Sequence, residues 1–216
     1  METSFTQQNI NKVIQSPYLT RRNLELVFGP NRRTLDYRIK SLINKNYLVK
    51  VKQGFYISTQ YMEKEPNPQL YLEFIGGILK EPSYVSLEYA LAKYNLIPES
   101  VFDITYVTTQ KTDKFVTSIG AFIYKSICNR LYLGFENIQY KDKIISFAYP
   151  YKAIFDLFYY ANFNNKDSIK DYVYSSRINW QNLDKSNLRQ LKKLMIDSKI
   201  KKMQILSQVL TQENIL

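Results

Sequence analysis

Histidine is absent from this sequence, and cysteine occurs only once, as Cys128. Without histidine the chain cannot form a Ser-His-Asp or Cys-His catalytic group or an HExxH zinc site. A single cysteine excludes an internal disulfide and fits a reducing compartment. The six glycines form neither of the common phosphate-binding loops, GxGxxG and GxxxxGKS/T. The sequence therefore predicts no metal site, no cofactor and a protein that is not an enzyme.

Long hydrophobic runs are missing as well. Charged residues interrupt the apolar stretches within about ten residues, well short of the roughly 20 that a helix needs to cross a bilayer. The opening residues, METSFTQQNINK, lack the hydrophobic centre of a signal peptide. We therefore expect a cytoplasmic protein without membrane contact.

Positive charge, by contrast, is abundant, with a net charge of +11. Residues 1–60 hold ten of the 30 basic residues but only three of the 19 acidic residues. Lysine and arginine neutralise phosphates and release their counterions, so a basic segment favours a polyanionic partner. The uneven distribution places that partner at the N-terminal quarter of the chain.

Residues 1–60 contain three helix patterns followed by two short strand patterns. Thr20 is a good N-cap for the second helix, and Asn31 follows a Gly-Pro break and can cap the third. Gly54 supplies the positive φ that a tight hairpin turn often needs. The helices are predicted over 3–15 (with Phe5 on its apolar side), 21–28 and 32–44 or 45, and the strands over 47–51 and 55–58.

The third helix has two chemically different faces. Its apolar face holds Leu35, Ile39, Leu42 and Ile43. At about 100° per residue, the opposite face holds cationic and hydrogen-bonding groups and no carboxylate, with Asp36 to one side. Such a face suits the major groove of DNA, although charged faces are often only solvated. The residues on this face are Arg33, Thr34, Tyr37, Lys40, Ser41 and Asn44.

Helix, helix, basic helix and basic hairpin in about 60 residues is the pattern of a winged helix-turn-helix. We predict this domain over residues 1–62, bound to double-stranded DNA as a dimer or cooperative pair. The predicted groove residues are Arg33, Thr34, Tyr37, Lys40 and Ser41. The predicted phosphate contacts are Arg32, Arg38, Lys50 and Lys52. An ordinary two-stranded ribbon is the alternative interpretation of the hairpin.

The polar, proline-containing segment 63–69 reads as a linker, and residues 70–216 as a mixed domain. Helices are expected over 71–79, from a Ser86 cap to about residue 94, over 151–160, and from about residue 167 onward. Four strands of an antiparallel or mixed sheet are expected in DITYVTT, KFVTSIGAFIYKSI, RLYLGFENIQY and KIISFAY. The expected fold class is α+β, with a winged helix, a roughly four-stranded sheet and a helical C-terminus.

The order of these segments resembles the AbiEi-type antitoxins, which are predicted transcriptional regulators of viral defence systems. The resemblance covers roughly residues 8–163. Its most specific pieces are SLEYAL at 86–91 with LIPE at 96–99, VTT at 107–109, Lys152-Ala153 and Asp156-Leu157. Tyr151 and Asn95 depart from the family pattern, which more often has Glu and His there.

The resemblance implies a partner and a second role. Proteins of this family pair with a nucleotidyltransferase-like toxin encoded next to them and repress their own promoter by binding inverted repeats. The larger C-terminal domain is linked to toxin neutralisation, in many cases without a stable complex. Lys152 and Asp156 are then candidates for an antitoxic surface. Their alternative interpretation is an ordinary i,i+4 pair on one helix.

Three other interpretations remain open from the residues. The chain could be a stand-alone regulator without a toxin. It could be a nuclease or nucleotidyltransferase, for which Asp103, Glu136, Asp142 and Lys143 are loosely spaced candidates. Its 19 tyrosines could stack on single-stranded nucleic acid, although most fall in strands or in the helix 151–160, which is apolar on nearly every side, and packing is expected there.

Overall fold

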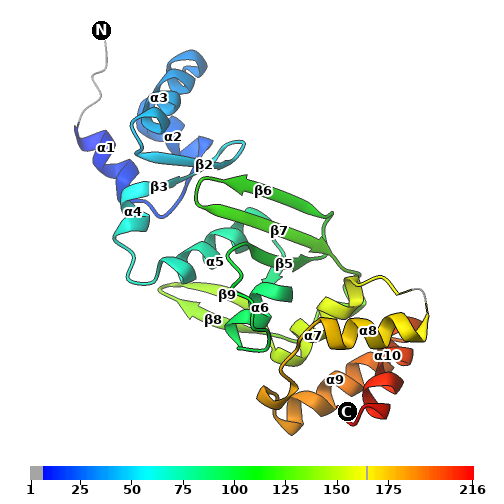
Figure 1. Ribbon diagram of the computed structural model, residues 1–216. Coiled ribbons are helices and arrows are strands. Elements are labelled where there is room, and N and C mark those ends of the chain that lie inside the picture. Colours follow the sequence, from blue (N-terminus) through cyan, green and yellow to red (C-terminus); the bar gives the residue numbers. More distant parts are fainter. Residues whose placement is uncertain (1–6, 164) are drawn as a thin grey trace. The chain divides into compact units, whose positions relative to one another are not determined.

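The computed structural model describes residues 7–163 and 165–216 (Figure 1). Phe5, part of the predicted first helix, lies outside these residues. The chain forms two compact units, one of Met1–Ile75 with Phe115–Ala121, the other of Gly76–Lys114 with Phe122–Leu216. The class is mixed α+β: N-terminal helices with a small three-stranded sheet, a six-stranded mixed sheet, and C-terminal helices. No helix of the described part of the chain has the length and apolar content needed to cross a membrane.

The first unit contains the predicted three helices and hairpin. Its small sheet has the order β1-β3-β2, with antiparallel pairing throughout. The segment predicted as a linker, 63–69, holds the end of α4 and the beginning of α5. The elements are α1 (Gln7–Ile14), β1 (Leu19–Thr20), α2 (Arg21–Phe28), α3 (Arg32–Asn44), β2 (Leu48–Lys52), β3 (Phe55–Ser58), α4 (Thr59–Glu63) and α5 (Pro68–Leu79), whose last four residues belong to the second unit.

Local capping explains why α2 and α3 begin where the sequence predicts. The Thr20 hydroxyl accepts a hydrogen bond from the Asn23 amide N–H, and the Asn23 side chain accepts one from the Thr20 N–H. Asn31 Oδ1 accepts from the Thr34 N–H at 3.1 Å. Each cap satisfies donors that the first turn of a helix leaves unpaired. Gly54 closes the hairpin with φ +74°.

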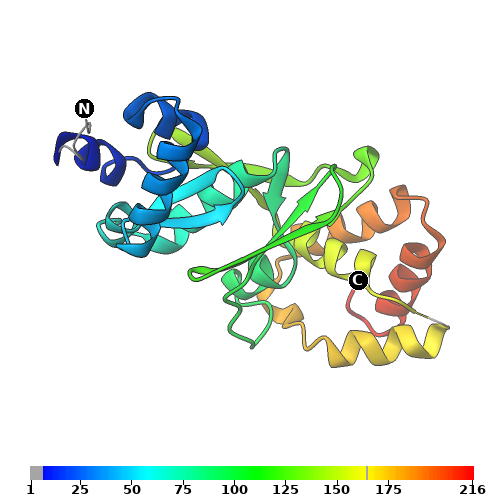
Figure 2. The ribbon, with the colours of Figure 1, turned by 90° about the horizontal axis from the view of Figure 1, so that it is seen from above.

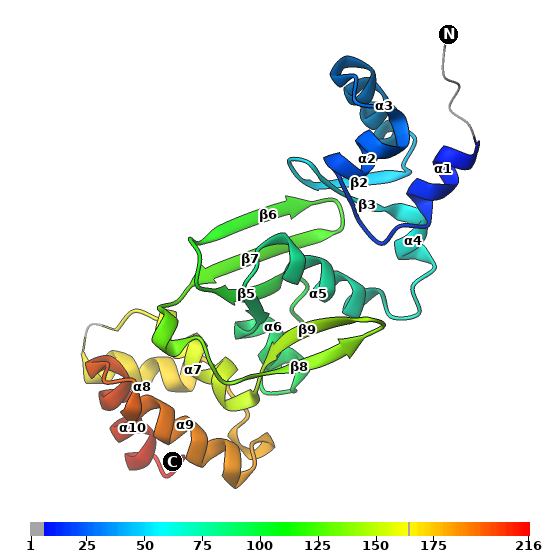
Figure 3. The same cartoon turned by 180° about the vertical axis from the view of Figure 1, so that it is seen from behind.

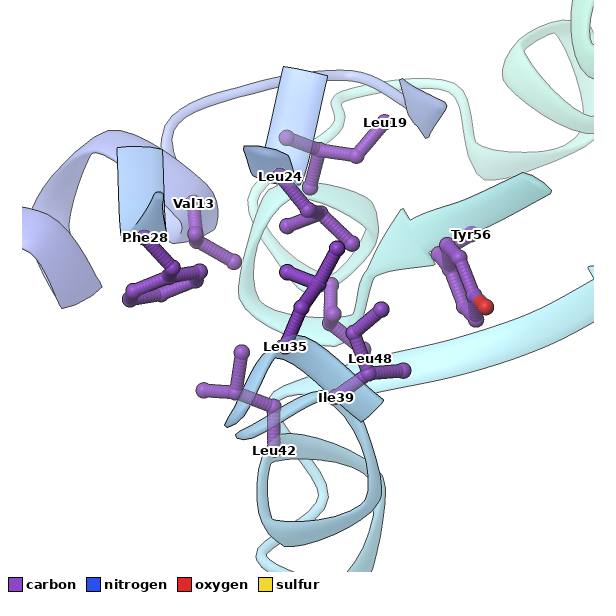
Figure 4. Close-up of a cluster of buried hydrophobic side chains, with 9 residues drawn as sticks. All are labelled: Val13, Leu19, Leu24, Phe28, Leu35, Ile39, Leu42, Leu48 and Tyr56. Carbon is purple, nitrogen blue, oxygen red and sulfur yellow. The ribbon is translucent and has the colours of Figure 1, made fainter. Parts of the chain in front are cut away.

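The core of the first unit joins these elements (Figure 4). Leu35, Ile39 and Leu42 of α3 lie within a cluster of nine buried side chains, and Ile43 packs against it partly buried. The predicted apolar face of α3 is therefore confirmed. The other members of the cluster are Val13, Leu19, Leu24, Phe28, Leu48 and Tyr56.

The large sheet has six strands in the order β6-β7-β5-β4-β9-β8 (Figure 3). Pairing is parallel between β5 and β7 and between β4 and β9, and antiparallel in β4–β5 and β8–β9, so the sheet is mixed. The strands are β4 (Ser83–Val85), β5 (Ile104–Thr108), β6 (Asp113–Thr117), β7 (Gly120–Ser126), β8 (Phe135–Tyr140) and β9 (Lys143–Ala148).

The predicted count of about four strands was wrong, for two reasons. The segment KFVTSIGAFIYKSI is not one strand, because the chain turns at Gly120, whose φ of +123° favours glycine. The strand β4 has only three residues, too few to show an alternating pattern. Tyr84 and Val85 are nevertheless fully buried, because β4 lies between β5 and β9 inside the sheet.

The remaining helices confirm the helical interpretation of the second unit (Figure 2). Pro150 begins α7, and every residue from Lys152 to Phe158 is buried. Trp180 stacks on Phe158 with the two rings 6° from parallel, which fastens the following segment to α7. These elements are α6 (Leu87–Lys93), η1 (Asn129–Leu131), α7 (Pro150–Tyr160), α8 (Lys166–Ser175), η2 (Trp180–Asn182), α9 (Lys185–Asp197) and α10 (Lys201–Gln212).

Two adjacent glycines of α5 give a matched stability test. A Cβ on Gly76 would lie 2.1 Å from the hydroxyl oxygen of Tyr106, which is buried and stacked on Tyr124, whereas a Cβ on Gly77 would meet nothing within 4 Å. We expect Gly76→Ala to lower the free energy of unfolding by about 1–3 kcal/mol through overpacking. Gly77→Ala should raise it by about 0.5–1 kcal/mol through helix propensity. Urea denaturation measures both, and equal effects at the two positions would contradict the close packing of Gly76.

Candidate nucleic-acid interface

The face of α3 opposite the core is open to solvent. Arg33, Thr34 and Lys40 are exposed and Ser41 is half-buried. Tyr37 retains 73% of its accessible surface, although an aromatic ring of this size usually packs against neighbours. The structure thus brings the five predicted groove residues to one helix surface.

The carboxylates near α3 are neutralised by arginine. Asp36 Oδ1 accepts a hydrogen bond from Arg21 Nη1 at 2.6 Å, and its Oδ2 lies 4.0 Å from Arg32 Nε. Glu25 lies 3.4 Å from Arg21 Nε. The hydrogen bond with Asp36 raises the pKa of Arg21 above its usual value. Arg21 and Arg32 together balance the two negative charges of Asp36 and Glu25 beside the exposed face.

No such partner reduces the charge of the face itself. Within residues 7–163 and 165–216, no carboxylate lies within 4.0 Å of the charged groups of Arg33 or Lys40. Arg32 lies 4.0 Å from Asp36 but keeps 90% of its side-chain surface exposed. The helix thus presents three accessible cations alongside hydroxyl donors.

Arg38 points the other way. It keeps 8% of its accessible surface, its Nη1 donates to the Phe28 carbonyl oxygen at 2.8 Å, and its guanidinium lies over the Phe28 ring. Position 38 is close in angle to Leu35 and Leu42 and far from Arg33, so the side chain enters the α2–α3 contact. The predicted phosphate contact of Arg38 is therefore wrong, because its buried guanidinium positions α3 against α2.

The two hairpin lysines differ from each other. Lys50 is exposed on β2. Lys52 is half-buried, with its Nζ 5.7 Å from the centre of the Phe115 ring. The pairing of β2 with β3 shifts register between Lys50 and Lys52.

The hairpin turn also contacts α2, because the Arg21 N–H donates a hydrogen bond to the Gly54 carbonyl oxygen at 2.8 Å.

Lys152 and Asp156 do not form a surface, because both side chains are 0% exposed. Lys152 Nζ donates to Asp156 Oδ1 at 2.6 Å and lies 4.7 Å from the centre of the Phe155 ring. Asp156 Oδ2 accepts from the Tyr84 and Ser86 hydroxyls at 3.0 and 2.8 Å. The i,i+4 spacing predicts a pair on one helix, but it cannot show that the helix turns this pair into the core.

The buried cluster of Tyr84, Ser86, Lys152 and Asp156 joins β4 to α7. Burial raises the pKa of Asp156 against the opposing effects of Lys152 and the two hydroxyl donors, and burial also raises the pKa of Tyr84. Ser86 stands at the N-cap of α6 as predicted, yet its side chain makes no capping bond and serves this cluster instead. The role of Tyr84 was missed because no local pattern marks a partner 72 residues away.

The acidic candidates for an enzyme are dispersed. Asp103 lines a cavity of about 770 Å³ with Glu88 and Glu99, whereas Asp142 pairs with Lys143 at the turn between β8 and β9. Among the described residues, no three Asp, Glu, Cys or His side chains come together as metal ligands. Five of the tyrosines are fully buried, in keeping with packing roles: Tyr71, Tyr84, Tyr89, Tyr106 and Tyr124.

Comparison with known proteins adds no assignment. The chain matches no protein-family model, and no curated protein has a matching sequence.

Proposed function

We propose that the first unit is a winged helix-turn-helix that binds double-stranded DNA and that the protein is a transcriptional regulator. The observation that carries this proposal is the exposed face of α3, where Arg33 and Lys40 have no carboxylate partner among the described residues and Asp36 is held by Arg21. A solvated helix face usually mixes charges of both signs. A face of donors alone fits the acceptor-rich edges and phosphates of the major groove.

In this proposal α3 is the recognition helix and the β2–β3 hairpin is the wing. Arg33, Tyr37 and Lys40, with Thr34 and Ser41 beside them, enter the groove. Arg32 and Lys50 contact phosphates on either side, while half-buried Lys52 lies nearer to Phe115 and contributes less. Arg38 keeps α3 against α2 through the Phe28 carbonyl.

Selection of duplexes from a random pool tests this function. The full chain should enrich one sequence class, and binding to it should be at least about 10³-fold tighter than to random duplexes at physiological salt. An inverted repeat upstream of the protein's own gene should compete for the same site, as expected for an autorepressor. Retention of all duplexes without enrichment would leave only nonspecific charge attraction and would overturn the regulator proposal.

A second proposed function is neutralisation of a nucleotidyltransferase-like toxin. It rests on the resemblance to AbiEi-type antitoxins, two segments of which meet in one buried cluster through Ser86, Lys152 and Asp156. Those residues support the fold of the second unit, so the surface that opposes a toxin lies elsewhere on it.

Co-expression separates the two functions. If a nucleotidyltransferase-like gene is adjacent, the full chain should rescue growth against its product. The full-length Arg33→Ala/Lys40→Ala variant should rescue equally, because its second unit is unchanged. Failure of the folded wild-type chain to rescue would contradict the antitoxin role. A gene without such a neighbour would favour a stand-alone regulator.

A further inference from the structure

A second concentration of positive charge lies near the C-terminus of the chain. Residues 185–202 contain seven lysines and arginines and a single carboxylate, Asp197. Outside this segment and residues 1–60, the chain holds thirteen basic and fifteen acidic residues. The positive excess of the whole protein therefore comes from two segments, and only the first is used by the proposed recognition helix.

Helix α9 displays this charge on its outer face. Its buried face holds Leu191, Leu194 and Met195. Opposite them, Lys185, Arg189 and Lys193 are exposed at intervals of four residues, with Lys192 half-buried between them. In the described part of the chain no carboxylate lies within 4.0 Å of any of these four charged groups.

This arrangement is unfavourable for the helix itself. The pairs Lys185–Arg189 and Arg189–Lys193 place like charges at i,i+4, and such pairs weaken a helix. Lys185 also adds a positive charge to the first turn, where the helix dipole disfavours cations, next to the favourable carboxylate of the N-cap Asp184. Lys202, in contrast, has a structural use, because its Nζ donates to the carbonyl oxygens of Tyr159 and Ala161. A row of like charges that no carboxylate of the described residues approaches within 4.0 Å fits an external polyanion.

The chemistry of the face favours nucleic acid over a lipid surface. A helix that lies in a membrane interface inserts a broad apolar face, but the apolar face of α9 is buried against α7 and α10. Ile196 is the one large apolar side chain that the structure shows as exposed on α9, at 49%. Cations without an apolar anchor bind phosphates along a backbone and do not distinguish sequences.

We infer that the outer face of α9 is a second, sequence-independent contact for the phosphates of duplex DNA. This inference rests on the proposed DNA-binding function and extends it to the second unit. The contact would add affinity and salt dependence, while α3 supplies the choice of sequence.

A matched pair of full-length triple variants tests this contact. The first is Lys185→Gln/Arg189→Gln/Lys193→Gln on α9. The second removes the same charge from exposed positions elsewhere in the second unit: Lys111→Gln/Lys114→Gln/Lys125→Gln. Fluorescence anisotropy with a labelled random-sequence duplex, between about 50 and 200 mM salt, gives the slope of log K against log salt.

The α9 variant should bind at least about tenfold more weakly than the wild type at the lower salt, and its salt slope should flatten by about 2.7, or 0.9 per lost phosphate contact. The control variant should change the slope by less than about one. Equal slopes for the two variants would overturn the inference. If the wild type binds duplex DNA but the α9 substitutions leave the salt slope unchanged, only the proposed α9 contact is contradicted. If the wild type binds no duplex at all, the proposed function fails with it.

Discussion

Replacing Lys152 with methionine is expected to lower the free energy of unfolding by about 3–5 kcal/mol. The substitution keeps most of the side-chain volume but removes the cation that faces Asp156 at 2.6 Å. A fully buried carboxylate that keeps its two hydroxyl donors but loses its counter-ion must either stay charged at high cost or take up a proton. Urea denaturation followed by circular dichroism measures the loss.

The double variant Lys152→Met/Asp156→Asn is the control for this effect. Asparagine Oδ1 can still accept hydrogen bonds from Tyr84 and Ser86, and no buried charge remains. We expect it to recover most of the stability, because apolar or neutral replacements of a whole buried ion pair are often close to neutral. A double variant as unstable as Lys152→Met would mean that lost packing, and not lost charge, causes the effect.

The pH dependence has a definite sign. Burial holds the pKa of Asp156 above its usual value even beside Lys152, and the loss of the ammonium group raises this pKa further. A carboxyl whose pKa is higher in the folded state opposes folding above that pKa and ceases to do so once protonated. The deficit of Lys152→Met relative to the wild type should therefore shrink as the pH falls. A deficit that stays constant with pH would contradict the assignment.

Removing Arg33 and Lys40 together should weaken binding of the selected duplex by about 2 kcal/mol or more, roughly thirtyfold. Both side chains are exposed, so Arg33→Ala/Lys40→Ala should unfold at the same urea concentration as the wild type. The matched control is Lys12→Ala/Lys64→Ala, which removes equal charge from exposed positions of α1 and the end of α4. Competition binding with the selected duplex compares the two.

The same titrations separate base contacts from phosphate contacts. Loss of a base contact relaxes the sequence preference at one position, whereas loss of a phosphate contact weakens binding to all duplexes and flattens the salt slope by about one. Equal affinities for the α3 variant and its control would show that the exposed face of α3 is not the binding surface.

The sequence predicted the first unit well because its signals are local. Thr20, Asn31 and Gly54 mark two helix starts and one turn within a few residues of where they act. The same local periodicity predicted the apolar face of α3, which the structure confirms. Arg38 was placed among the phosphate contacts because of its charge, although its angular position beside Leu35 and Leu42 indicates the α2–α3 contact.

The second unit depends on distant partners, and the sequence predicted less of it. Ser86 and Asp156 are 70 residues apart, so neither the pairing nor the burial of Lys152 could be read from spacing. The strand β4 is defined by its neighbours β5 and β9 and not by its own three residues. Prediction failed where long-range contacts, and not local propensity, decide the structure.

Arg21 carries a consequence for how DNA would be recognised. Its backbone N–H holds the hairpin turn at Gly54, while its guanidinium holds α3 at Asp36. The β2–β3 hairpin and α3 are thereby both held by one residue. In the proposed binding mode, these two contacts would hold the hairpin and α3 in place before a duplex binds, which would lower the entropic cost of association. In the proposed DNA-binding role, the N-terminal unit would be preorganised in part by an arginine that need not touch the DNA.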